Sequence, residues 1–187
     1  MVSGIGALSD CASRPGDPGA PPTSWPGGTR LARSPGLPSL VMIAHPHCPC
    51  TRASLGELDR IVARLGGGLA VSVLFIGPEE ADDDWWRTDL TSRARAIPGV
   101  EVVVDRGGAE ARRFGAETSG QTLLYDARGR LVFRGGITGA RGHAGDNAGR
   151  SAVLAYVSNG TEPRVDNPAF GCALDGTTPA AAGVTKP

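Results

Sequence analysis

The sequence is short of the features that mark several common classes of protein. Only four cysteines occur among its 187 residues, too few for a scaffold held together by disulfides. Acidic and basic residues balance at 19 each, so the net charge gives no support for binding nucleic acid or an anionic membrane surface. No apolar run approaches the length of a membrane-spanning helix. These absences predict a globular protein without nucleic-acid partners and without an integral membrane segment.

The N-terminal residues also lack the basic start and the sustained apolar stretch of a signal peptide. As written, the chain is expected in the cytoplasm, whereas a missing upstream leader would make it an exported or membrane-tethered protein. Nearly half of the 15 prolines then fall between Pro15 and Pro38. This composition predicts a disordered or loosely packed leader over residues 1–37.

Strand and helix patterns alternate through the middle of the chain. Short apolar runs predict buried strands over residues 39–45, 69–77 and 100–105, and amphipathic or charged runs predict helices over residues 51–66, 79–97 and 108–116. Two β-rich runs flank a turn at residues 126–129, and a last helix is expected near residues 147–158 with Asp146 as its N-cap. The order predicts one α/β domain over residues 38–158, with a mixed sheet between helices, and an irregular C-terminal tail over residues 159–187.

Two of the four cysteines lie one residue apart in "HPHCPCTRASLGEL", which runs from His45 to Leu58. The motif joins a predicted strand to a predicted helix. A helix that begins near Cys50 directs its free N–H groups and the positive end of its dipole towards the sulfurs, which favours thiolate over thiol. Protonated His45 and His47 would favour the thiolate further. This placement predicts reactive or metal-binding cysteines.

Three runs together resemble the thioredoxin-like superfamily, and within it the bacterial thioredoxin-domain proteins of the RedB type. They are "HPHCPCTRASLGEL", "SGQTLLYDARGRLVFRGGIT" and "RGHAGDNAG", and the resemblance extends over residues 24–174. It implies a thioredoxin-like three-layer α/β/α sandwich and thiol redox chemistry.

The sequence departs from the usual thioredoxin pattern at two positions. Only Pro49 separates the cysteines, where thioredoxins have two residues, and Gln121 stands where they have a cis-proline before a strand. A disulfide across one residue closes a small, strained ring, which predicts a more oxidising pair than that of thioredoxin. Since the proline in those proteins presents substrate and keeps metals off the cysteines, its absence leaves metal binding open.

The first functional hypothesis is a thiol–disulfide oxidoreductase with Cys48 and Cys50 as its catalytic pair. Cys48 is expected to be the more exposed cysteine and the nucleophile. Cys172, which Phe170 and Leu174 could anchor near the site, is a candidate resolving cysteine. The expected partners are a protein or small-molecule disulfide and a thiol electron donor, and no cofactor is required.

The alternative is a copper or zinc binding or delivery protein. Thiolates and imidazoles suit both metals, so Cys48 and Cys50 could be completed by His45, His47, His143 or Cys172. A third interpretation treats the cysteines as inert, buried packing residues. The sequence leaves these possibilities open.

Overall fold

The computed structural model describes residues 13–161 and 166–174. Its strands and helices follow the predicted alternation closely. In chain order they are β1 (Ser39–Ala44), α2 (Thr51–Leu65), β2 (Ala70–Gly77), α3 (Asp83–Trp86), α4 (Asp89–Ala96), β3 (Val100–Arg106), α5 (Ala109–Arg113), β4 (Gln121–Tyr125), β5 (Leu131–Gly135) and α6 (Ala148–Asn159). None of these helices combines the length and the apolar character needed to cross a membrane.

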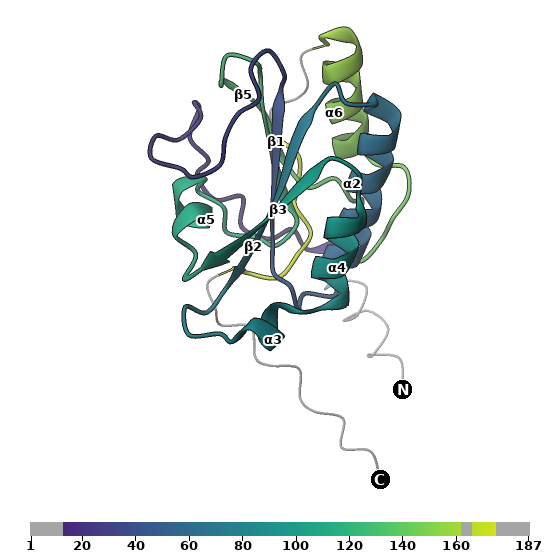
Figure 1. Ribbon diagram of the computed structural model, residues 1–187. Coiled ribbons are helices and arrows are strands. Elements are labelled where there is room, and N and C mark those ends of the chain that lie inside the picture. The colour runs from purple at the N-terminus through teal and green to yellow at the C-terminus, as the bar shows by residue number, and fades with distance from the viewer. Residues whose placement is uncertain (1–12, 162–165, 175–187) are drawn as a thin grey trace, which may run out of the picture.

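The strands form one mixed sheet in the order β3-β2-β1-β4-β5 (Figure 1). β1 lies parallel to β2 and β2 lies parallel to β3, whereas β4 runs antiparallel to both β1 and β5. The hairpin predicted around residues 126–129 therefore forms and supplies the antiparallel edge. Because β1 lies at the centre of the sheet, the loop that follows it emerges at the middle of one sheet end.

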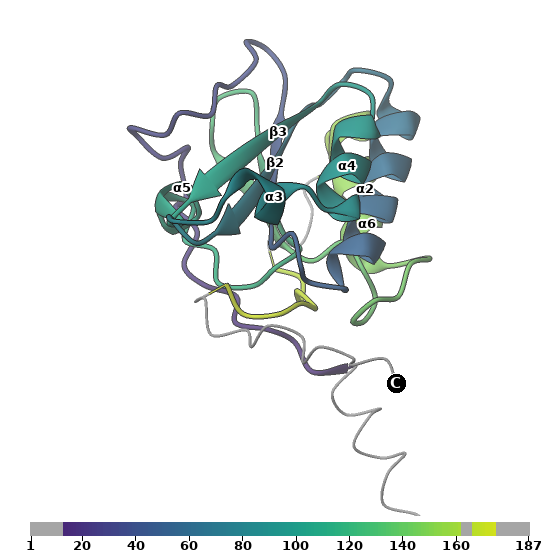
Figure 2. The same cartoon turned by 60° about the horizontal axis from the view of Figure 1, so that its bottom comes forward.

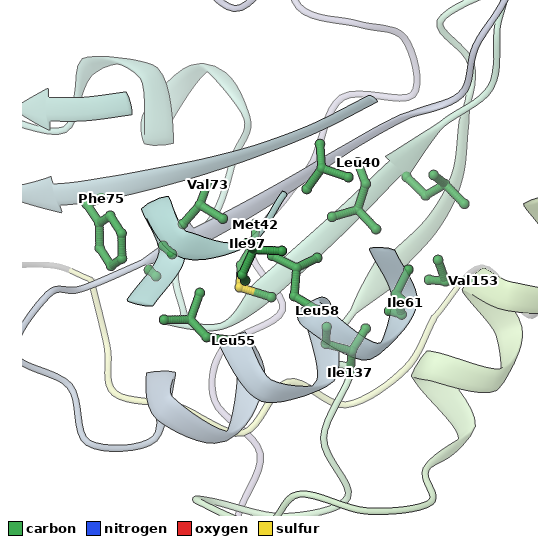
Figure 3. Close-up of a cluster of buried hydrophobic side chains, with 14 of the residues drawn as sticks. Leu40, Met42, Leu55, Leu58, Ile61, Val73, Phe75, Ile97, Ile137 and Val153 are labelled. Carbon is green, nitrogen blue, oxygen red and sulfur yellow. The ribbon is translucent and has the colours of Figure 1, made fainter. Parts of the chain in front are cut away.

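Side chains of β1 alternate between two hydrophobic clusters, one on each face of the sheet. Leu40 and Met42 pack with residues of α2, α4 and α6, which cover one face together (Figures 2 and 3). Val41 and Ile43 pack on the other face, where α5 lies (Figure 1). The result is the expected three-layer α/β/α arrangement with a mixed sheet.

Two details of the helices differ from the sequence-based expectation. The single helix expected over residues 79–97 is divided into α3 and α4, because Thr88 caps a new helix. Its side chain accepts a hydrogen bond from the Thr91 N–H, and the Thr91 hydroxyl accepts one from the Thr88 N–H, a reciprocal capping box. The N-cap of α6 is Asn147 rather than Asp146, and its side chain accepts from the Arg150 N–H.

Residues 13–38, which we call the leader segment, lie against the α5 face of the sheet. Leu31 is buried among residues of that face, and Trp25 packs edge-on against Phe114 and Tyr125. The backbone N–H of Trp25 donates to the Gly129 carbonyl at 2.7 Å. Neither Trp25 nor Leu31 lies in a helix. The domain boundaries at residues 37 and 158 stay predictions.

Candidate functional site

The cysteine motif forms a tight loop between β1 and α2. The Cys48 N–H donates to the His45 carbonyl at 3.1 Å, and the Thr51 N–H donates to the Cys48 carbonyl at 3.0 Å. α2 begins at Thr51 with Cys50 as its N-cap residue, and no side chain caps its free N–H groups. As the sequence predicts, the positive end of the helix dipole lies beside the two sulfurs.

A segment of the tail, residues 166–174, brings a third cysteine to this loop. The Ser119 N–H donates to the Cys172 carbonyl at 2.8 Å, and the Leu174 N–H donates to the Glu117 carbonyl at 2.9 Å. Leu174 is buried on the α5 face of the sheet, while Phe170 is half-buried. The tail segment is therefore held by backbone pairing, by the buried side chains of Ala169 and Leu174, and by the ion pair between Asp166 and Arg134.

The sulfurs of Cys48, Cys50 and Cys172 all lie within 4.8 Å of one another, and we call them the three-sulfur cluster. The Cys48 and Cys172 sulfurs are 3.0 Å apart, and all three cysteines are free thiols. Cys48 is only 1% exposed, whereas Cys50 and Cys172 are partly exposed. The expectation that Cys48 is the more exposed of the pair is wrong, because the tail segment brings Cys172 against it.

The cluster distributes its protons unequally. Hydrogen bonds from the thiols of Cys172 and Cys50 lower the pKa of Cys48 far below its ordinary value of 9.0. The pKa of Cys172 is raised, chiefly by its hydrogen bond with Cys48 and next by its hydrogen bond with Cys50. The hydrogen bond between Cys50 and Cys172 lowers the pKa of Cys50. This effect is outweighed by the hydrogen bond to Cys48, by burial and by the charge of Cys48, so the pKa of Cys50 is raised. The hydrogen bonds of the cluster thus favour the thiolate at Cys48, the least exposed sulfur.

Two of the three histidines lie in or beside the cysteine loop and contact the Trp85 ring, His45 edge-on and His47 at a tilt. The His47 ring is 4.5 Å from the Trp85 ring, and the His45 ring is 5.6 Å from it. The backbone N–H of His47 donates to the ring nitrogen Nδ1 of His45 at 3.2 Å. The ring nitrogen Nε2 of His47 contacts the Trp85 carbonyl at 3.0 Å. Burial, and then the charge of His47, lower the pKa of His45, so its imidazole is held neutral.

No histidine belongs to the three-sulfur cluster, among the residues that the structure describes. His143, on the loop between β5 and α6, is exposed and its ring contacts the Arg141 carbonyl. Of the cysteines and histidines expected as ligands, the structure therefore brings together only the three cysteines. His45 and His47 contact each other and Trp85 instead.

Gln121 begins β4, and its side chain holds neighbouring backbone in place. Its amide donates to the Pro18 carbonyl at 2.8 Å, and its carbonyl accepts from the Glu117 N–H at 3.2 Å. No cis peptide bond occurs among the described residues. The position that carries proline in thioredoxins is used here to tie the leader segment to the turn before β4.

Sequence reasoning missed two residues of the site, Ser119 and Arg141. Ser119 is buried, and its hydroxyl accepts from the His45 N–H at 2.9 Å and contacts the Thr51 hydroxyl at 3.1 Å. Arg141 lies close enough to Cys50 for its charge to oppose part of the rise in that thiol's pKa. Neither residue belongs to a recognisable motif, although both lie within two of the runs from which the RedB-type resemblance was predicted.

The fold and the site together define the class: the chain has a thioredoxin-like fold with cysteines at the start of the helix after β1. A thioredoxin-like protein solved in its oxidized form has a TM-score of 0.51 and 15% identity, over 71% of this chain and 95% of that one.

Two further solved structures match over more of the chain. A hypothetical protein from Sinorhizobium meliloti has a TM-score of 0.61 and 22% identity, over 88% of this chain and 96% of that one. An uncharacterized conserved protein from Geobacillus kaustophilus has a TM-score of 0.63 and 17% identity, over 87% and 92%. A scan of protein-family models and a search of curated proteins give no match. At these identities the likeness establishes the fold alone.

Proposed function

We propose that the protein is a thiol–disulfide oxidoreductase whose redox centre is the three-sulfur cluster. The observation that carries the proposal is the 3.0 Å separation of the Cys48 and Cys172 sulfurs beside the free N-terminus of α2. A disulfide needs about 2.05 Å, so a movement of about 1 Å would bond these sulfurs. The thioredoxin-like fold supports the same chemistry.

In the direction of substrate reduction, a protein thiolate attacks one sulfur of a substrate disulfide. The substrate S–S bond breaks, a mixed disulfide forms, and the first substrate thiolate leaves. A second cysteine of the cluster then attacks the protein sulfur of the mixed disulfide, which releases the second substrate thiolate and leaves an intramolecular disulfide. Two electrons pass to the substrate, and an external thiol returns them to the protein. Substrate oxidation is the reverse sequence.

Cys50 is the partly exposed member of the motif and fits the contact with substrate, after its thiol has lost its proton to solvent. Cys48 fits the attack on the mixed disulfide, which leaves a Cys48–Cys50 disulfide. Cys172 can then attack the Cys48 sulfur and release the Cys50 thiolate, so that the internal disulfide moves to Cys48–Cys172. Cys172 lies nearest to Cys48 and is supplied by the tail segment. These roles keep Cys48 and Cys50 as the catalytic pair and Cys172 as a resolving cysteine, but they move the nucleophile from Cys48, as the sequence-based hypothesis has it, to Cys50. The particular resemblance to RedB-type proteins stays a prediction.

The experiment is thiol trapping with mass spectrometry in glutathione buffers of graded potential. Cys11 lies outside the described residues, so a Cys11→Ser background leaves only the cluster. We expect one intramolecular disulfide and one free thiol on oxidation, and insulin reduction that is lost in Cys48→Ser. If no pair of cysteines forms a disulfide in excess oxidised glutathione, or if Cys48→Ser retains full insulin reduction, the proposal is wrong.

A second candidate function is the binding or delivery of copper(I). Three sulfurs within 4.8 Å of one another are a donor set for one soft cation, with thiolate as its preferred ligand. Zinc fits less well, because it prefers four ligands and the described residues offer three. Metal analysis after purification from copper-supplemented medium tests this candidate. Loss of stoichiometric copper in Cys172→Ser but not in His45→Ala would support the three-sulfur set, and metal-free protein would exclude it.

A further inference from the structure

Cys50 is the sulfur of the motif that an incoming disulfide can reach. Cys48 is 1% exposed and lies against Cys172, whereas Cys50 at the start of α2 is partly exposed. Whatever surrounds Cys50 will therefore influence which disulfides react. The loop between β5 and α6 passes beside this first turn of α2 (Figures 1 and 2).

Arg141 is the cationic residue that this loop places near Cys50. The backbone around it is fixed by a turn, in which the His143 N–H donates to the Ala140 carbonyl at 3.2 Å and Gly142 has a φ of 69°. The side chain is half-buried, and its nitrogen Nε is buried without a hydrogen-bond partner. Its charge also acts on Cys50, where it opposes the rise in pKa that the hydrogen bond to Cys48 and burial produce. The guanidinium is thus held near the reactive sulfur and has unused donor capacity.

The acidic side chains that contact this loop are already paired. Glu57 accepts from the Gly145 N–H at 2.8 Å and forms ion pairs with Arg60 and Arg150. Asp146 forms an ion pair with Arg150. Within the described part of the chain, Arg141 takes part in no ion pair. Its positive charge is therefore available to a ligand.

We propose that Arg141 determines substrate choice at Cys50 by favouring disulfides that carry an anionic group, such as a carboxylate, close to the sulfur atoms. This inference rests on the proposed function and names its substrate class. Cys50 loses its proton to solvent, and its thiolate attacks the nearer substrate sulfur. The substrate S–S bond breaks, and Arg141 attracts the carboxylate and the departing thiolate. A fixed guanidinium suits this task because it remains charged at all working pH values.

The test uses reduced Cys11→Ser protein and three small disulfides of different charge. These are the dianionic dithiobis(nitrobenzoate), the neutral dithiodipyridine and the dicationic cystamine, with second-order rate constants measured at low and high salt. The neutral disulfide reports any change in sulfur reactivity, so the anionic-to-neutral ratio isolates charge selection. In Arg141→Gln we expect that ratio to fall roughly tenfold at low salt and much less at high salt. Arg141→Lys should keep most of it.

Arg64→Gln is the matched control, since it removes the same charge near the opposite end of α2, about 20 Å from the cluster by the helical rise. It should leave the ratio unchanged. If Arg141→Gln slows all three disulfides equally, Arg141 acts only on the sulfur and the inference is overturned, while the proposed function stands. If the unsubstituted protein reacts with none of the three, the inference and the proposed function both fall.

Discussion

The sulfur of Cys172 lies 3.0 Å from the sulfur of Cys48, although 124 positions separate the two residues in the chain. Ser119 links them, because its N–H donates to the Cys172 carbonyl while its hydroxyl accepts from the His45 N–H. The tail segment and the cysteine loop are therefore fixed to one buried residue. The geometry makes the tail part of the proposed redox site.

The unequal protonation of the cluster predicts one stable thiolate in the reduced protein. Hydrogen bonds from Cys172 and Cys50 lower the pKa of Cys48, so its thiolate should persist at pH values well below the ordinary thiol pKa of 9.0. Ultraviolet thiolate absorbance, followed during acid titration of the Cys11→Ser protein, measures this. Cys172→Ser, which replaces the nearest thiol donor, should change the pKa of Cys48. Absorbance unchanged by Cys48→Ser would contradict the assignment.

Gly171→Ala should separate the tail segment from the cluster. A methyl group at this position would lie 1.7 Å from the Ser119 carbonyl oxygen, so the backbone must move away. Overpacking of this kind costs about 1–3 kcal/mol, and we expect the Cys48–Cys172 disulfide to form about tenfold more slowly. Oxidation kinetics in a background of Cys11→Ser and Cys50→Ser measure the rate. Gly27→Ala is the control, because its added methyl group meets nothing within 4 Å.

His45 should make the stability of the protein depend on pH. Burial and the charge of His47 lower its pKa in the folded protein below the ordinary 6.5, so the unfolded chain binds more protons. The free energy of unfolding should therefore decrease as the pH falls below 6.5 and level off below the folded-state pKa. Urea unfolding at a series of pH values measures this slope.

Two variants separate the causes of that slope. His45→Asn should flatten it, and His47→Gln should reduce it by removing the charge that opposes protonation of His45. A slope that is the same in His45→Asn as in the unsubstituted protein would assign it to another group.

Glu57→Ala should destabilise the packing of α6 and its loop against α2. The carboxylate is fully buried and is shared by Arg150, Arg60 and the Gly145 N–H. Removal of one partner from a buried ion pair costs about 3–5 kcal/mol, and urea unfolding should show a loss of that order. Asp59→Ala, an exposed substitution on the same helix, should change stability by less than about 0.5 kcal/mol.

Trp25→Ala tests whether the leader segment contributes to the folded domain. The indole packs edge-on against Phe114 and Tyr125, with ring centroids 5.3 and 5.2 Å away. Since the side chain is half-buried, we expect a loss of about 2–3 kcal/mol, somewhat less than for a fully buried tryptophan. Thermal unfolding measures it, with the exposed Thr23→Ala as control. No change in stability would mean that the leader is not part of the cooperative unit.

The regular elements could be predicted because their residues form local patterns. The continuous apolar run of β1 and the apolar face of α2 are visible in the sequence, and both were located within a residue or two. The break between α3 and α4 was missed because it depends on mutual hydrogen bonds of Thr88 and Thr91, within a run that otherwise reads as helix.

The site could be predicted only in part, because several of its residues are far from the cysteine motif in the sequence. Cys48 and Cys50 could be placed at a helix start from their neighbours alone. The burial of Cys48 depends on Cys172, and the positions of Ser119 and Arg141 depend on loops without periodicity. Trp25 and Leu31 lie in a proline-rich segment, whose composition gives no sign of its apolar contacts. The burial or position of each of these residues depends on long-range packing, which a local sequence pattern does not contain.

The remote origin of Cys172 has a consequence for biosynthesis. At typical translation rates, the 124 positions after Cys48 take on the order of ten seconds to be added. During that interval the growing chain has Cys48 and Cys50 without their third partner. Until the segment that carries Cys172 leaves the ribosome and packs against the cysteine loop, Cys48 and Cys50 can exchange with disulfides of other molecules without competition from Cys172.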